Sequence, residues 1–183
     1  MKMSKISDEN IISLDEIAVY LNEKPTHGWS KKGTECIIKS KNKQIINTRY
    51  TVCMATSKNK VLDYTIVKGS LKTNKFSNFI KKINKNTNNK YTLFMDNATI
   101  HKSKVVNQCI KDNNIKVIYN VPYHSEYNPI EYIFSLLRKD LQQKDNTTES
   151  KIIKIINEFK INITQKTINN IFNKTSEMIN KCI

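Results

Sequence analysis

The sequence predicts one α/β domain in which helices flank a mixed β-sheet. The first half of the chain holds short runs of apolar or alternating residues separated by turn signals, which favours neighbouring antiparallel strands. The second half alternates helical and strand-like segments, which favours strands linked through helices. The 183 residues are enough for one domain with a real core and few for two.

The order of elements follows from the spacing of apolar residues. Helical spacing is clearest from residue 74 to 83, where Phe76, Phe79, Ile80 and Ile83 share one face. The predicted strands are residues 11–21, 35–39, 49–56, 61–67, 91–95 and 115–119, and the predicted helices are 74–83, 103–113 and 129–142, with one or two more in the tail from residue 148. No boundary is clear, although residues 144–148 could be a linker. We therefore expect a domain over residues 1–145 and a helical C-terminal extension of it over residues 146–183.

The chain is strongly basic, with 31 Lys and Arg against 16 Asp and Glu and a formal net charge of +15. Such a charge favours a polyanionic partner and predicts binding that weakens with salt. A lysine- and asparagine-rich composition would give the same charge without any such partner, so the charge permits nucleic-acid binding and does not establish it. Three glycines are too few for a Gly-rich phosphate loop.

The four cysteines form no CxxC pair and have no nearby histidine pair, which argues against a zinc site and a disulfide scaffold. We expect reduced, buried thiols at Cys36, Cys53, Cys109 and Cys182. The first ten residues lack the apolar core of a signal peptide, and no apolar run approaches the ~18 residues of a membrane span. The expected location is intracellular, with no membrane partner.

Three acidic residues occupy positions that a sheet could bring together. Asp15 lies in the first strand, Asp96 ends the strand 91–95, and Glu131 opens the helix from residue 129. If those two strands are neighbours, the three carboxylates meet at one edge and repel one another unless a cation neutralises them. Oxygen ligands suit Mg²⁺ or Mn²⁺ rather than zinc. Two such ions about 3.5–4 Å apart can drive in-line attack on a phosphodiester.

Each acid also has a purely structural interpretation. Asp96, followed by Asn97, could begin a turn and bond nearby backbone amides. Glu131 could complete a capping box with Asn128, three residues earlier. Asp15 adjoins Glu16, and because successive strand residues face opposite sides, only one of the two can point into the site.

Four segments resemble the DDE catalytic domain of mariner-like transposases and their bacterial insertion-sequence relatives. They are Leu-Asp-Glu at 14–16, Gly-Trp-Ser-Lys-Lys-Gly at 28–33, Phe-Met-Asp-Asn-Ala-Thr-Ile-His at 94–101 and Val-Pro-Tyr-His-Ser-Glu-Tyr-Asn-Pro-Ile-Glu at 121–131. The last is the most specific, and the interval between Asp96 and Glu131 has the length that the resemblance leads one to expect. The similarity covers about residues 11–142.

The resemblance implies an RNase H-like fold, an α/β mixed five-stranded sheet flanked by helices, and metal-dependent DNA cleavage and strand transfer at transposon ends. Asp15, Asp96 and Glu131 would be the catalytic residues and would bind Mg²⁺ or Mn²⁺, as two ions. Neighbours that could steady the triad or contact DNA are Asn97, His101, His124, Asn128, Trp29, Lys102 and Arg138. His124 stands where the family pattern usually has serine. Trp29 has an equally weighted alternative role as a turn residue covering the core.

The expected partner is double-stranded DNA, both transposon ends and target, bound by a homodimer. Full-length relatives carry helix-turn-helix segments before the catalytic domain, whereas this sequence begins shortly before Asp15. We therefore expect either a separate DNA-recognition subunit or the catalytic half of a split or decayed element. An RNase H-like nuclease without strand transfer and a catalytically inactive DNA-binding remnant are the alternative functions.

Overall fold

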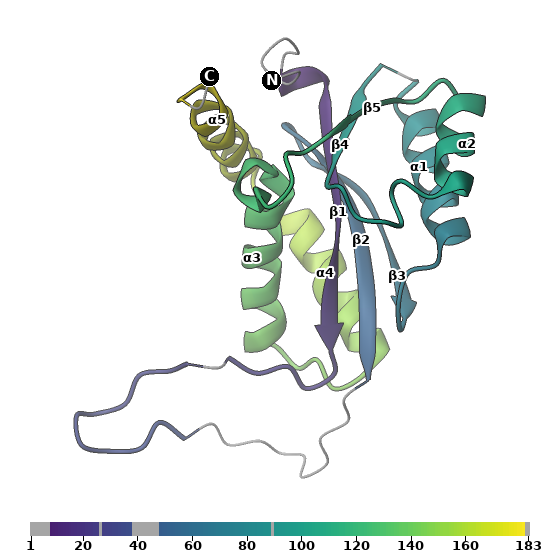
Figure 1. The fold of residues 1–183 in the computed structure, drawn as a ribbon. Coiled ribbons are helices and arrows are strands. Elements are labelled where there is room, and N and C mark those ends of the chain that lie inside the picture. The colour runs from purple at the N-terminus through teal and green to yellow at the C-terminus, as the bar shows by residue number, and fades with distance from the viewer. Residues whose placement is uncertain (1–7, 26, 38–47, 89, 182–183) are drawn as a thin grey trace.

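A five-stranded mixed sheet forms the centre of the molecule, with strand order β3-β2-β1-β4-β5 (Figure 1). The computed structural model describes residues 8–25, 27–37, 48–88 and 90–181. β1 (Ile11–Tyr20), β2 (Arg49–Ser57) and β3 (Val61–Lys68) pair antiparallel, while β4 (Thr92–Met95) runs parallel to β1 and β5 (Lys116–Tyr119) parallel to β4. The predicted mixed five-stranded sheet is confirmed.

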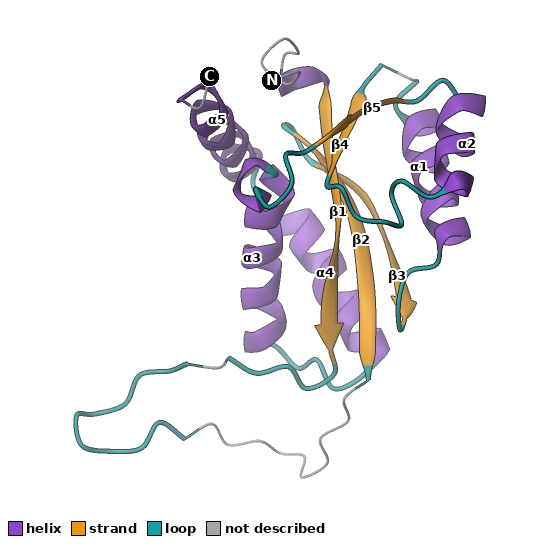
Figure 2. Cartoon of the chain, in the orientation of Figure 1, coloured by secondary structure: helices purple, strands orange, loops and turns teal. Residues whose placement is uncertain are grey.

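Helices cover both faces of this sheet (Figure 2). α1 (Thr73–Asn86) and α2 (Lys104–Asp112) pack on one face, and α3 (Pro129–Gln143) and α4 (Glu149–Asn162) on the other. α5 (Gln165–Lys181) packs against α3, and 3-10 turns occupy Asp8–Asn10 and Ser125–Tyr127. The helices predicted from apolar spacing are all present. None of the helices in the described part of the chain is both long and apolar enough to cross a membrane.

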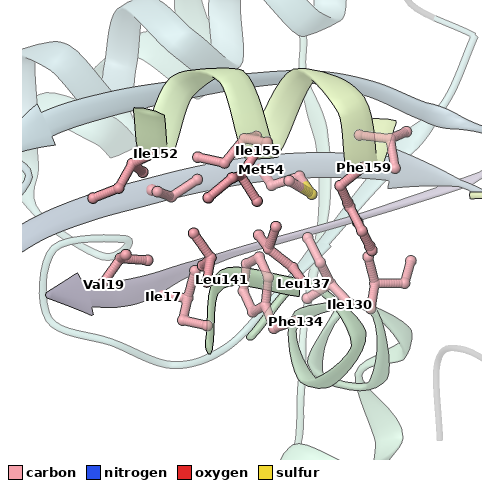
Figure 3. Packing of buried hydrophobic residues seen from close by; sticks show 14 of the residues in the cluster. Ile17, Val19, Met54, Ile130, Phe134, Leu137, Leu141, Ile152, Ile155 and Phe159 are labelled. Carbon is pink, nitrogen blue, oxygen red and sulfur yellow. The ribbon is translucent and has the colours of Figure 1, made fainter. Parts of the chain in front are cut away.

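The alternation of side chains along β1 builds the two halves of the core. Ile12 and Leu14 point to the α1–α2 side, whereas Ile17 and Val19 point to the α3–α4 side. Figure 3 shows the second half, where the β1 side chains meet Met54 of β2 and the apolar faces of α3 and α4. From α3 come Ile130, Phe134, Leu137 and Leu141, and from α4 come Ile152, Ile155 and Phe159. Because α3 is bound into this core, its first turn has a fixed position over β1.

The strand predicted at residues 35–39 is wrong where the structure describes it. Glu35–Ile37 is irregular and belongs to the long β1–β2 connection, and residues 38 and 39 lie outside the described residues. β1 and β2 pair directly with each other, from Ile12–Ser57 to Tyr20–Arg49, so no strand edge lies between them for a third segment to join. Ile37 is accordingly exposed.

Two smaller expectations also change. Cys53 and Cys109 are buried as predicted, but Cys36 is exposed because its segment carries no strand, and Cys182 lies outside the described residues. In the candidate linker at residues 144–148, Asn146 is buried, whereas Asp145 and Thr148 are exposed. The buried Asn146 side chain donates hydrogen bonds to the carbonyl oxygens of Glu23 (2.9 Å) and Leu141 (2.8 Å). The division into residues 1–145 and 146–183 stays a prediction.

Candidate active site

Asp15, Asp96 and Glu131 line one pocket of about 480 Å³. β4 pairs with β1 only from Ile11–Thr92 to Ser13–Phe94, so Asp15 lies just past the part of β1 that pairs with β4. Asp96 follows the last residue of β4, and Glu131 lies in the first turn of α3, which packs against β1. The structure therefore brings together the three acids that the sequence singled out. The remaining lining residues are Asn97, Asn120, Val121, Pro122, Tyr123, His124, Ser125 and Asn128.

Asp15 is a buried carboxyl with both oxygens in hydrogen bonds. Oδ1 accepts from the Glu16 amide at 2.7 Å, and Oδ2 accepts from Asn128 Nδ2 at 3.1 Å. Burial, followed by the nearby charge of Asp96, raises its pKa to about 8. The charges of Glu16 and Glu131 act in the same direction, whereas the hydrogen bond from the Glu16 amide opposes the rise. Asp15 therefore favours either a proton or a neighbouring cation at neutral pH.

Asp96 plays a structural and an electrostatic role at once. Its Oδ1 accepts from the Ala98 amide at 2.9 Å, which is the turn predicted for Asp96, and also from His101 Nδ1 at 2.7 Å. The hydrogen bond from His101 is the main reason that the pKa of Asp96 is lowered. The pKa of Glu131, in contrast, is raised, mainly by burial and then by the charge of Asp96.

The capping box considered for Glu131 does not form. The Asn128 amide donates to the Ser125 carbonyl oxygen at 2.8 Å, and the Asn128 side chain makes no capping hydrogen bond to α3. Ser13 of β1 takes that role, because its hydroxyl accepts from the Ile130 amide at 3.2 Å and donates to Asn128 Oδ1. The Asn128 side chain is therefore free to hold Asp15, and Glu131 remains at the pocket.

The ring of His101 is fully buried between two carboxylates. Nδ1 faces Asp96, Nε2 lies 3.0 Å from Glu16 Oε2, and the ring stacks on Phe76 of α1 with centroids 4.5 Å apart. Burial opposes its charged form, but hydrogen bonds to Asp96 and then Glu16 raise its pKa to about 10. The expectation that this imidazole contacts a member of the triad fits this geometry.

Ser13 and Glu16 are the residues that sequence reasoning missed. Both flank Asp15 on β1, and strand alternation carries the information needed to place them. Ser13 shares the face of Asp15, under the start of α3, whereas Glu16 points to the opposite face, where His101 lies. The pairing of each with a partner far along the chain could not be read from spacing alone.

Two further candidates, Asn97 and His124, line the pocket. Asn97 lines the pocket and donates through Nδ2 to the Asn120 carbonyl oxygen, joining the loops after β4 and β5. His124, half-exposed in the pocket wall, bonds Glu126 Oε1 at 2.7 Å and stacks on Tyr127.

Trp29, Lys102 and Arg138 lie outside the pocket lining. Trp29 is fully exposed in the β1–β2 connection, so the alternative in which it covers the core is wrong. Lys102 places Nζ 5.0 Å from the centroid of the Tyr119 ring. Arg138 bonds Glu23 at 2.7 Å and the Ala18 carbonyl oxygen at 3.3 Å, which ties α3 to the open edge of β1.

The donor set suits a hard divalent cation. All three acids offer oxygen, and burial followed by the charge of Asp96 raises the pKa values of Asp15 and Glu131, effects that a bound cation would oppose. Across the described ranges, no group of three His, Cys, Asp or Glu side chains is close enough to hold one ion together. The three carboxylates that line the pocket are the candidate ligands.

Comparison with known proteins places this fold. A sequence model of the DDE superfamily endonucleases matches residues 10–154. No protein of curated function matches the sequence. The structure resembles the Mos1 mariner paired-end complex with Mn, with a TM-score of 0.82 at 14% identity over 99% of this chain and 57% of that one. It also resembles the Mos1 strand transfer complex, with a TM-score of 0.78 at 16% identity over 95% of this chain and 53% of that one.

The crystal structure of the catalytic domain of Mos1 mariner transposase gives a TM-score of 0.75 at 15% identity, over 96% of this chain and 81% of that one. The chain thus shares the RNase H-like fold of that catalytic domain and spans just over half of the transposase chains in the DNA complexes. Since the sequence model covers most of its length, the chain belongs to the DDE superfamily endonucleases.

Proposed function

We propose that the chain is a transposase catalytic domain that cleaves DNA phosphodiester bonds and transfers the cut strand. The observation that carries the proposal is the convergence of Asp15, Asp96 and Glu131, from three distant segments of the chain, on a single pocket. Membership in the DDE superfamily endonucleases supports the class of reaction. The Mos1 structures to which the chain is similar include a paired-end complex and a strand transfer complex.

The three acids, Asp15, Asp96 and Glu131, would hold Mg²⁺ or Mn²⁺, as two ions. Mos1 structures contain Mn or Mg, which supports divalent metal use in this fold. Bound ions would supply activation of a water or a DNA 3′-hydroxyl and stabilisation of the leaving oxygen.

The chain's own residues prepare this chemistry by fixing the carboxylates. Asn128 holds Asp15 from the side of α3, and Ser13 fixes Asn128 together with the start of that helix. His101 keeps Asp96 in its charged form by donating a hydrogen bond to it. Positions set in advance reduce the reorganisation that the reaction requires.

Double-stranded DNA is the proposed substrate, and the net charge of +15 supports attraction to its phosphates. Lys102, Arg138 and the exposed Trp29 are candidates for contacts outside the pocket. A homodimer on DNA and a separate DNA-recognition subunit are part of the proposal, as is a location inside the cell with the DNA.

The test is nicking of supercoiled plasmid by the purified chain with Mg²⁺ or Mn²⁺, beside Asp96→Asn and Glu131→Gln. Asp63→Asn is a matched control, because Asp63 pairs with Lys82 at 2.6 Å on β3, outside the pocket lining. The expected result is metal-dependent nicking that both site variants lose and the control keeps. Joining of a labelled 3′-hydroxyl oligonucleotide to the plasmid separates strand transfer from plain nuclease activity. A folded chain that binds DNA and never nicks it would refute the proposal and point to an inactive remnant.

A further inference from the structure

Glu16 belongs to β1 next to Asp15 but contributes nothing to the pocket lining. Its side chain extends from the opposite face of the strand and is largely buried. Both carboxylate oxygens lie near His101 Nε2, Oε1 at 3.1 Å and Oε2 at 3.0 Å. A buried carboxylate is costly unless it is paired, so this contact accounts for the presence of Glu16 on that face.

His101 is held from several sides. Its ring stacks on Phe76, its amide donates to the Ala98 carbonyl oxygen at 3.0 Å, and its carbonyl oxygen accepts from Tyr119 Oη at 3.2 Å. A charged carboxylate only accepts hydrogen bonds, so a ring between two of them must donate from both nitrogens. The geometry therefore makes a continuous chain from Glu16 through an imidazolium to Asp96.

This chain of hydrogen bonds determines which carboxylate oxygen of Asp96 is available to bind a cation. Oδ1 already accepts from the Ala98 amide and from His101 Nδ1. Within the described part of the chain, no hydrogen bond engages Oδ2. Fixing Oδ1 therefore fixes the direction of Oδ2, the oxygen that remains for a cation.

The position of Asp96 in the sheet explains why such a support is needed. Strand pairing between β4 and β1 ends at Ser13–Phe94, two residues before Asp96. Beyond that point no β1–β4 ladder connects the strand that carries Asp15 to the loop that carries Asp96. The Glu16–His101 contact supplies that connection by a side-chain route on the α1–α2 side of the sheet.

We infer that Glu16 is a positioning residue for the reaction, which acts through His101 to orient Asp96 toward the metal. The inference rests on the proposed function, because it assigns Asp96 to a metal. Partners that orient a ligand from behind typically change metal affinity or activity by about 10–100-fold when they are removed. A purely structural ion pair would change stability and leave metal affinity alone.

The experiment measures Mn²⁺ binding by isothermal titration calorimetry, with the metal alone, at a temperature where every variant is folded. Glu16→Gln keeps the shape of the side chain and removes its charge, and Glu16→Ala removes the acceptor. We expect Mn²⁺ affinity to fall about 10–100-fold in both, with nicking reduced and metal-free DNA binding unchanged. Asp63→Asn, which breaks the Asp63–Lys82 pair on the same side of the sheet, should bind Mn²⁺ like the wild type.

A double-variant cycle tests whether Glu16 affects metal binding through Asp96. If Glu16 acts through Asp96, adding Glu16→Gln to Asp96→Asn should cause little further loss of Mn²⁺ affinity. Folded Glu16→Gln and Glu16→Ala proteins that bind Mn²⁺ and nick DNA like the wild type would overturn the inference and leave the proposed function standing. An equal loss in Asp63→Asn would also overturn it. A wild-type chain that binds no Mn²⁺ would instead refute the proposed function, and this inference with it.

Discussion

Ser13 is a small residue whose removal should cost far more than its size indicates. It is fully buried, and its hydroxyl donates to Asn128 Oδ1 and accepts from the Ile130 amide. Asn128, also buried, donates in turn to Asp15 Oδ2 at 3.1 Å. Ser13→Ala therefore removes one group that links β1, the start of α3 and the candidate metal ligand Asp15.

The expected loss follows from the two groups left without a partner. Asn128 Oδ1 and the Ile130 amide would each stay buried and unpaired, at about 1–3 kcal/mol apiece. The alanine methyl is easier to bury than a hydroxyl, which offsets part of this cost. A net loss of about 2–4 kcal/mol remains, and for a chain of this size it corresponds to a fall in Tm of roughly 5–15 °C.

Calorimetry and urea denaturation of the wild type, Ser13→Ala and Ser77→Ala test this estimate. Ser77 is the matched control, because its buried hydroxyl donates to the Thr73 carbonyl oxygen one turn earlier in α1, at 3.0 Å. That carbonyl keeps its helical bond when the hydroxyl is lost, so the control should lose under about 1 kcal/mol. If Ser13→Ala is no less stable than Ser77→Ala, the Ser13 hydroxyl does not tie β1 to α3, and the reasoning is refuted.

Three further predictions follow from charge and burial. The folded-state pKa of Asp15, about 8, lies above the ordinary aspartate value of 3.8. The metal-free fold is therefore most stable at low pH, where the carboxyl is protonated, and this stability is lost as pH rises toward 8. Between pH 5 and 7 the wild type should therefore lose up to about 1.4 kcal/mol per pH unit relative to Asp15→Asn, and parallel Tm curves would contradict this. DNA affinity should fall at least about tenfold between 50 and 200 mM NaCl in a fluorescence titration, and an affinity independent of salt would contradict phosphate binding. Exposed Cys36 should react with a maleimide well before Cys53, whose thiol pKa is raised mainly by burial; peptide mass spectrometry would show the reverse order if that burial were wrong.

Local periodicity predicted most of the fold because each element carries its own apolar stripe. The face of Phe76, Phe79 and Ile80 predicted α1, and alternation around Val52 and Met54 predicted β2. The segment 35–39 has the same local character and still forms no strand over Glu35–Ile37. Whether an apolar run becomes a strand depends on a free sheet edge, which is a property of the whole topology.

The candidate site likewise has residues that the sequence predicted and residues that it did not. Their places in the predicted elements and the resemblance to DDE catalytic domains identified Asp15, Asp96 and Glu131. The parallel pairing of β1 with β4 explains why Asp15 and Asp96 meet, and the packing of α3 against β1 adds Glu131. His101 and Asn128, which contact Asp96 and Asp15, were among the predicted neighbours. Their own partners were not predicted, since Ser13 bonds Asn128 and Glu16 bonds His101 across long stretches of sequence. Such pairs depend on the packing of α3 over one face of β1 and of the loop after β4 against the other.

The charges around the pocket explain why Asp15 is the residue most dependent on a cation. Asp96 is stabilised in its charged form by His101 and by Lys102, and Arg138 lowers the pKa of Glu131. Every charged group that perturbs Asp15 is an acid, and burial acts on Asp15 in the same direction. The metal-free protein can relieve this strain only by keeping a proton on Asp15. The burial that makes a charged Asp15 destabilising is therefore the same property that would favour a divalent cation beside it, so that stability without metal and affinity for metal are opposed at this residue.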